Sequence, residues 1–296
     1  MKPFCAFIAM VAFELAGGQA FAQEAVSARG HFADLNRARI YYEDHGSGEP
    51  LLLLHNFGAT ASQWKTYIDD WAPRYRVIAW DMRGHAETES PDDPAQYSEA
   101  LTIADMAGLM DMLGIEKAVV GGLSLGGFMS LAFQLAHRER VRALLLCDTG
   151  PGYRSDEPRA KWNRMAEKSA LNFEEKGLDA AGRSPEVQAA VKYHRSAAGL
   201  AHSARGMLAQ FDSRVIDDLS EIDVPTLIIV GERDEPYHDA SRYMQSKIPG
   251  GRLEIIPDAG HAANMDQPDA FNRVLLEFLG SLPNKSTLGS PTPGPQ

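Results

Sequence analysis

Short apolar runs alternate with amphipathic segments along most of the chain, and this alternation limits the fold more than any other sequence feature. Each run is short and apolar on both faces, which is typical of strands in a parallel sheet covered by helices. These runs are residues 50–54, 76–80, 117–120, 141–147, 225–230 and 252–256. Between them, residues 101–113 and the residues after Ser124 place apolar side chains three and four positions apart, as amphipathic helices do. The pattern predicts an α/β fold with a mostly parallel sheet, preceded by an antiparallel hairpin at residues 30–34 and 39–43.

The alternation stops between residues 150 and 222, where helix-prone segments occur without a convincing strand. These segments include residues 158–171 and 185–198. We therefore predict a core made of residues 23–149 and 223–280, with residues 150–222 inserted as a helical cap. Residues 281–296 are rich in Pro, Gly and Ser and are predicted to form a disordered tail.

The first residues are predicted to be an export signal. Lys2 supplies a positive charge, residues 4–13 are apolar but too few to span a bilayer, and Ala20-Phe21-Ala22 fits a small-x-small cleavage site. Cleavage after residue 22 would remove residues 1–22 and send the protein to a periplasm or out of the cell. The alternative is a cytosolic protein with an apolar, disordered start. No later stretch is apolar enough to predict stable membrane insertion.

Charge and cysteine content exclude several classes of function. The chain has 29 Lys and Arg against 40 Asp and Glu, and its net charge of -11 would repel a nucleic-acid backbone. Its cysteines are Cys5, which leaves with the signal, and Cys147, which lies in an apolar run and is predicted to be a buried thiol. No spacing of Cys and His predicts a metal site.

The chemistry is predicted to centre on Ser124. Residues 119–127 read as an apolar strand, then Gly-x-Ser-x-Gly, then a helix, which is the context that gives this motif the geometry of a nucleophile elbow. Gly122 and Gly126 leave room for a tight turn that exposes the serine hydroxyl. The backbone N–H of Leu125 begins the helix and is a candidate oxyanion donor.

With the elbow, three further motifs make the chain resemble the α/β-hydrolase superfamily over residues 30–280. They are the oxyanion-type loop His55-Asn56-Phe57-Gly58, with Asn56 where Gly is commoner, the loop Asp81-Met82-Arg83-Gly84-His85, with Ala86 in place of the family's last Gly, and the loop around His261. The chain is most similar to small cap-bearing esterases and lactonases, including 3-oxoadipate enol-lactonases. The resemblance implies an eight-stranded, mostly parallel sheet flanked by helices, with the cap inserted after the sixth strand.

A serine nucleophile needs a base, and the base needs an acid to orient it. In the order typical of the family, nucleophile, acid and histidine, the best candidates are Ser124, Asp234 and His261. Asp148, at the end of the strand before the cap, is a competing acid. It could equally line the pocket or cap a turn.

The resemblance places the second oxyanion donor at the backbone N–H of Phe57, whose side chain could also wall the acyl pocket. His55 is expected to order this loop. His55, Asn56, Asp148 and Trp162 are candidate pocket residues, and Met165, Tyr193 and Met207 are weaker candidates from the cap.

Other polar residues are interpreted as structural or solvated. Asp81 and Arg83 are expected to form an ion pair, and Trp64 is expected to pack in the core. Four further histidines are expected to be solvated: His137, His194, His202 and His238.

These assignments predict a serine hydrolase that cleaves a carboxylic ester or lactone through an acyl-enzyme on Ser124, without a cofactor or metal. Its partner is a small-molecule substrate, and the sequence carries no signal of an oligomeric state. A carbon–carbon bond hydrolase, a perhydrolase and a slow-turnover ligand receptor remain as alternatives on the same triad. Serine at the elbow argues against dehalogenases and epoxide hydrolases, which need a carboxylate nucleophile.

Overall fold

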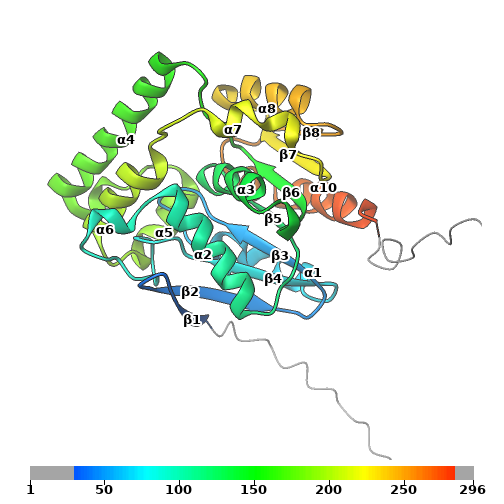
Figure 1. The fold of residues 1–296 in the computed structure, drawn as a ribbon, viewed down its shortest axis with the longest axis horizontal. Coiled ribbons are helices and arrows are strands. Elements are labelled where there is room, and N and C mark those ends of the chain that lie inside the picture. Colours follow the sequence, from blue (N-terminus) through cyan, green and yellow to red (C-terminus); the bar gives the residue numbers. More distant parts are fainter. Residues whose placement is uncertain (1–29, 284–296) are drawn as a thin grey trace, which may run out of the picture.

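The computed structural model describes residues 30–283. Within them, eight strands form one sheet in the order β1-β2-β4-β3-β5-β6-β7-β8 (Figure 1). The strands are β1 Gly30–Leu35, β2 Ala38–His45, β3 Glu49–Leu54, β4 Tyr75–Trp80, β5 Ala118–Leu123, β6 Val141–Cys147, β7 Thr226–Gly231 and β8 Arg252–Ile256. The β1–β2 hairpin joins β4 in antiparallel pairing, and all other pairings are parallel. The mostly parallel eight-stranded sheet predicted from the sequence is confirmed. The predicted signal peptide (1–22) and residues 284–296 of the predicted tail lie outside the described residues.

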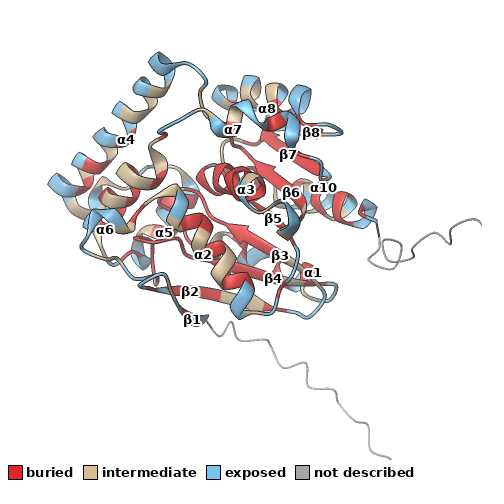
Figure 2. Cartoon of the chain, in the orientation of Figure 1, coloured by how far each residue is buried: buried red, intermediate tan, exposed pale blue. Residues whose placement is uncertain are grey.

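Helices cover both faces of the sheet. Alternate strand residues point to opposite faces, so Leu52 and Leu54 pack with α2, α3 and α8 while Leu51 and Leu53 pack with α1 and α10. These helices and the short α9 have the following bounds: α1 Ile68–Trp71, α2 Glu99–Met112, α3 Leu125–Ala136, α8 Glu235–Lys247, α9 Ala263–Asp266 and α10 Pro268–Ser281. Figure 2 shows the middle strands as almost continuously buried.

Some core expectations are confirmed and one is wrong. Trp64 and Cys147 are fully buried, as predicted. The expectation that every run is buried on both faces fails at β8, where the side chain of Ile255 is 42% exposed. The physical reason is position, because β8 is an edge strand and only β7 pairs with it. Helix α10 also continues through Ser281, the first residue of the predicted tail.

Residues 150–222, called the cap segment below, contain four α-helices and no strand. The helices are α4 Asp156–Lys176, α5 Pro185–Ala190, α6 Ala197–Ser203 and α7 Arg214–Asp217. Helix α4 packs along α6, beside the core helices (Figure 1). The helical pattern over 185–198 is interrupted, because His194 is extended, with ψ at 139°. No helix in the part of the chain that the structure describes is both long and apolar enough to cross a membrane.

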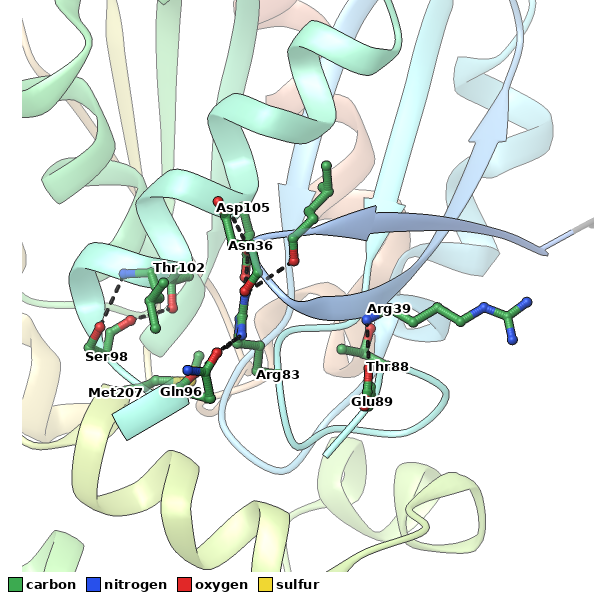
Figure 3. Close-up of polar contacts among 12 residues, drawn as sticks. Asn36, Arg39, Arg83, Thr88, Glu89, Gln96, Ser98, Thr102, Asp105 and Met207 are labelled. Carbon is green, nitrogen blue, oxygen red and sulfur yellow. Dashed lines mark hydrogen bonds and ion pairs between the residues drawn. The ribbon is translucent and has the colours of Figure 1, made fainter. Parts of the chain in front are cut away.

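A buried ion pair joins the loop after β4 to α2, and it differs from the pair expected from the sequence. Arg83 pairs with Asp105, with an Nε–Oδ2 distance of 2.6 Å and an Nη2–Oδ1 distance of 2.9 Å (Figure 3). Arg83 is 1% exposed and Asp105 is fully buried. Asn36, in the turn, donates its side-chain amide to the same carboxylate. Asp81 instead accepts the backbone N–H of Ala61 and of Glu87.

The expected Asp81–Arg83 pair is therefore wrong. Periodicity identifies the apolar face of α2. Periodicity does not show that the β1–β2 turn and Arg83 cover the first part of the opposite face of α2.

Removing the Asp105 charge should destabilise the fold strongly. Asp105→Asn leaves the Arg83 guanidinium buried without a counter-charge, and the free energy of unfolding should fall by about 3–5 kcal/mol in urea titrations. The matched control is Asp212→Asn, which breaks an exposed pair with Arg214 and should cost less than about 1 kcal/mol. Equal effects of the two variants would contradict the role of the buried pair.

Candidate active site

Ser124 occupies the sharp turn between β5 and α3 that its motif predicts. Its φ is 55° and its ψ is -113°, in the sterically costly positive-φ region for a residue with a side chain. A Cβ on Gly122 would lie 2.6 Å from the carbonyl oxygen of Leu54, and one on Gly126 would lie 2.7 Å from the same atom. Both positions therefore require glycine. The turn lifts the Ser124 side chain to the carboxyl edge of the sheet.

His261 and Asp234 are brought together at the same edge. Asp234 lies between β7 and α8, and His261 lies between β8 and α9. The His261 Nδ1 atom is 2.8 Å from Asp234 Oδ2. The Asp234 side chain is 7% exposed and that of His261 is 29% exposed. When Nδ1–H donates to this carboxylate, His261 Nε2 keeps a lone pair for proton transfer.

Tyr237 covers one side of this histidine. Its ring centre is 4.9 Å from that of His261, with the two rings at 30°. Burial raises the pKa of Tyr237 to about 12, a rise that the adjoining Ser124 hydroxyl opposes, so the phenol stays neutral. Among the described residues, Ser124 makes no direct side-chain hydrogen bond to His261, and such catalytic bonds often tighten only when substrate is bound. Sequence reasoning missed Tyr237. The signal in the sequence that could have identified it is its position three residues after Asp234, in the first turn of α8.

Asp148, the competing acid, adjoins Asp234 instead of His261. It is fully buried, with φ at 44°, and its Oδ1 accepts the Gly231 backbone N–H at 2.7 Å. Burial, together with the neighbouring charge of Asp234, raises the pKa of Asp148 well above its ordinary range. Of these two carboxyl groups, Asp148 is therefore the one that burial favours in the protonated form, and Asp234 is the one that contacts the imidazole.

The two candidate oxyanion donors, the backbone N–H groups of Leu125 and Phe57, belong to different parts of the fold. Leu125 is the first residue of α3, so its N–H has no acceptor within the helix. Phe57 belongs to a turn in which the Asn56 carbonyl oxygen accepts His55 Nδ1 at 2.8 Å and the Ala59 N–H at 3.0 Å. In a planar trans peptide, N–H and C=O point in opposite directions. The Phe57 N–H therefore points away from these donors, and no protein acceptor for it is found within residues 30–283.

Three buried histidines hold this turn. His55, His85 and His194 follow one another with ring centres 4.8 and 5.7 Å apart. Each ring accepts a backbone N–H on one nitrogen, from Met82, Gly58 and Ala86 respectively. The other nitrogen of each ring contacts a backbone carbonyl oxygen. All three are therefore neutral, and the backbone selects the tautomer of each.

His194 corrects an expectation from the sequence. It is 6% exposed and reaches from the cap segment to the turn, whereas it was expected to be solvated. The other three histidines of that group, His137, His202 and His238, are only partly buried. His55 lies where it orders the oxyanion-type loop.

A cavity of about 300 Å³ opens beside Ser124. Aromatic side chains supply much of its wall, and Trp162 is the one predicted pocket residue that lines it. Its lining residues are Ser124, Leu125, Phe128, Thr149, Gly150, Pro151, Gly152, Tyr153, Trp162, Leu208, Gln210, Pro236, Tyr237, Asp239 and Ala240. The cap side of the wall is held by Trp162 Nε1, which donates to the Leu208 carbonyl oxygen at 2.7 Å.

The other predicted pocket residues lie elsewhere. His55, Asn56 and Asp148 are buried and are not among the described residues that line this cavity. Met165 and Tyr193 are exposed, and Met207 is packed in the core. The Phe57 side chain lines a separate cavity of about 180 Å³ with Phe173 and Val187. Periodicity located these side chains on elements, but only the path of the cap segment decides which of them reach the serine.

Charge in the Ser124 cavity is of one sign. Asp239 is the only charged side chain among the described residues that line it. No group of three or more His, Cys, Asp or Glu in residues 30–283 is arranged to hold a metal ion.

The histidine cluster should make stability depend on pH. Burial first, and then the neighbouring imidazoles, lower the pKa of His85 well below the ordinary 6.5. Its contribution is therefore complete above about pH 6.5 and is lost as the pH falls, because only the unfolded chain readily takes the proton. The stability difference between wild type and His85→Gln should shrink by about 1.4 kcal/mol per pH unit between pH 6.5 and 5.

Urea midpoints for both proteins at pH 7.5, 6.5 and 5 measure this difference. Burial raises the pKa of Asp81 to about 7, so protonation of this group stabilises the fold as the pH falls. This opposite effect is the same in both proteins and cancels in the difference between them. Parallel stability profiles would contradict the assignment of a neutral His85.

Comparison with known proteins finds hydrolases that this chain resembles. A thermophilic esterase from Thermogutta terrifontis has a TM-score of 0.75 at 28% identity, covering 86% of this chain and 99% of its own. An enol-lactonase from Burkholderia xenovorans LB400 has a TM-score of 0.69 at 26% identity, covering 85% and 100%. The 2-hydroxy-6-oxononadienedioate/2-hydroxy-6-oxononatrienedioate hydrolase 2 of Pseudomonas putida is 28% identical over 264 residues, covering 81% of this chain and 91% of its own.

The alpha/beta hydrolase family matches residues 51–274, a stretch that contains Ser124, Asp234 and His261. This match confirms the resemblance inferred from the motifs. Because it spans well over half of the chain, the protein belongs to the alpha/beta hydrolase family.

Proposed function

We propose that this alpha/beta hydrolase is a serine hydrolase that cleaves an uncharged carboxylic ester or lactone through an acyl-enzyme on Ser124. One observation carries the proposal: a serine held at positive φ lines a cavity of about 300 Å³, at the sheet edge where His261 and Asp234 meet at 2.8 Å. A strained serine that lines a cavity, with an oriented imidazole at the same sheet edge, is the arrangement that nucleophilic acyl transfer requires.

In the proposed reaction, Ser124 Oγ attacks the acyl carbon while His261 Nε2 takes the hydroxyl proton. The N–H groups of Phe57 and Leu125 stabilise the oxyanion, and Asp234 stabilises the imidazolium. The carbon–oxygen bond to the alcohol then breaks, and His261 returns the proton to the leaving oxygen. Water attacks the acyl-enzyme by the same route and releases the carboxylic acid. With a lactone the alcohol stays attached, so the product is a hydroxy acid.

The charge of the cavity supports uncharged substrates over the carbon–carbon hydrolase alternative. The Pseudomonas putida relative acts, by its name, on a dienedioate, which carries two carboxylates. In this protein no Lys or Arg is among the described lining residues, while Asp239 is. A carboxylate entering this cavity would lose hydration without gaining a counter-charge. The esterase and enol-lactonase neighbours also favour ester or lactone chemistry.

The deciding experiment combines covalent labelling with intact mass. Wild type purified from an exporting host should gain one adduct with a fluorophosphonate, and Ser124→Ala should gain none. We also propose export, so the mature mass should correspond to a chain that begins at Gln23. A full-length mass would contradict export alone. A folded wild type that takes no label would overturn the activated serine and favour the ligand receptor.

Turnover then separates the remaining alternatives. 4-Nitrophenyl butyrate and mono-4-nitrophenyl succinate differ mainly by a terminal carboxylate, so we expect kcat/KM to be at least about 10-fold higher for the butyrate, equivalent to about 1.4 kcal/mol. A preference for the succinate, or cleavage of a vinylogous diketone acid without ester cleavage, would favour the carbon–carbon hydrolase. Acyl transfer that occurs only with peroxide would favour the perhydrolase.

The two acids should respond differently to amidation. Asp234→Asn removes the carboxylate that contacts His261 and should lower kcat by about 10⁴-fold, as loss of the triad acid does elsewhere. Asp148→Asn keeps the acceptor for the Gly231 N–H and a donor toward Asp234, and Asn tolerates the positive φ. It should keep kcat within about 10-fold of wild type. Steady-state rates on 4-nitrophenyl butyrate measure both, and the reverse ranking would identify Asp148 as the acid.

A further inference from the structure

One side chain of the cap segment bonds directly to the backbone of the oxyanion-type turn, residues 55–59, which contains the oxyanion-type loop. His194 Nε2 lies 2.8 Å from the Gly58 carbonyl oxygen, and His194 Nδ1 accepts the Ala86 N–H at 3.1 Å. Because Nδ1 is the acceptor, the ring proton is on Nε2 and is donated to Gly58. The ring is 6% exposed, so water does not compete freely for this bond.

The bond to Gly58 leads to the Phe57 N–H through two peptide units. The Gly58 carbonyl shares a peptide with the Ala59 N–H, which donates to the Asn56 carbonyl oxygen at 3.0 Å. The Asn56 carbonyl in turn shares a peptide with the Phe57 N–H. Each peptide is planar, so the direction of one end sets the direction of the other. Hydrogen bonds in such a chain also polarise one another.

The rest of the turn leaves this route little freedom. Gly58 has φ at 78°, a conformation that favours glycine, and its N–H is bound to His85 Nε2 at 3.1 Å. His85 and His194 therefore hold the two polar groups of one residue, one from the core and one from the cap segment. Without His194, the Gly58 carbonyl loses its buried donor, and the Gly58–Ala59 peptide is held only by the bond from the Ala59 N–H to the Asn56 carbonyl oxygen.

We propose that His194 is a positioning residue of the oxyanion hole, through which the cap segment sets the direction of the Phe57 N–H. The inference rests on the proposed function, because it assigns His194 a role in the acyl-transfer transition state. The cap segment is then part of the catalytic framework as well as a wall of the cavity.

A second tie between the same two regions supplies a matched control. Arg195, the next residue, pairs with Glu87 on the surface, where its side chain is 67% exposed. That pair also joins the cap segment to the loop after β4, but it does not touch the turn. If His194 only docked the cap segment, loss of either tie should have a similar kind of effect.

The test uses four variants of the full chain with 4-nitrophenyl butyrate and a boronic acid that mimics the tetrahedral intermediate. His194→Ala should lower kcat by about 10- to 100-fold, less than deletion of an oxyanion donor, with KM within about 3-fold. Boronate affinity should fall in parallel with kcat. His194→Gln places a donor near the position of Nε2 and should restore kcat to within about 5-fold of wild type. His194→Asn can replace only the Nδ1 acceptor for the Ala86 N–H, not the donor to Gly58, and should resemble His194→Ala. Arg195→Ala should match wild type in every respect.

The outcomes distinguish this inference from the proposed function. If wild type fails to turn over esters, or Ser124→Ala retains activity, the proposed function fails and the assignment of His194 fails with it. If wild type is active but His194→Ala changes KM alone, or Gln and Asn rescue equally, the positioning role is overturned while the hydrolase stands. Thermal unfolding of each variant shows whether it folds. If His194→Ala does not fold, the kcat of His194→Gln compared with that of Arg195→Ala decides.

Discussion

Parallel pairing between β3, β5, β6, β7 and β8 is the constraint on which the site depends. The register places Leu54 beside Gly122, Leu123 beside Cys147, and Gly231 beside Ile256. Residues just beyond these strand ends must therefore meet at one edge, although they are far apart in the sequence. The oxyanion-type loop, Ser124, Asp148, Asp234 and the His261 loop all follow such ends. A shift of register by one residue would exchange the buried faces of a strand, so the two hydrophobic layers also keep the site aligned.

Burial at this edge limits how many groups can be charged. Asp148 and Asp234 adjoin, and burial raises the pKa of the more deeply buried Asp148, which favours its protonated form beside the carboxyl group that contacts His261. The histidines beneath the oxyanion-type loop remain neutral for the same reason, since burial disfavours the charged imidazole. The arrangement concentrates one carboxylate and one mobile proton where acyl transfer needs them. As a consequence, the framework depends on the protonation state of these buried histidine rings.

The oxyanion-type turn shows how side chains can control a backbone donor. Two core histidines and one cap histidine bind the peptide groups between Asn56 and Ala59, and none of them is placed to take the serine proton. Preorganised donors lower the energy of a developing oxyanion because they need not reorient during the reaction. Fixing the Phe57 N–H from both the core and the cap segment serves this requirement. It also links the cap segment, which forms part of the cavity wall, to the chemistry within the cavity.

Local patterns in the sequence determined the elements of the fold and the identity of the candidate triad. Strand runs, the apolar faces of α2 and α3, and the glycines around Ser124 depend on neighbours within a few residues, so periodicity and steric rules suffice to predict them. Ser124, Asp234 and His261 follow β5, β7 and β8, in the chain order that is typical of the family.

Only the tertiary structure decided which distant side chains meet. It paired Arg83 with Asp105 instead of Asp81, placed Tyr237 against His261, and carried His194 from an interrupted helix into the core. Each of these contacts depends on the path of a loop or of the cap segment, and a one-residue change in that path would direct the side chain elsewhere. Burial then set the protonation of Asp148, because desolvation depends on every segment packed around a group and not on its own sequence.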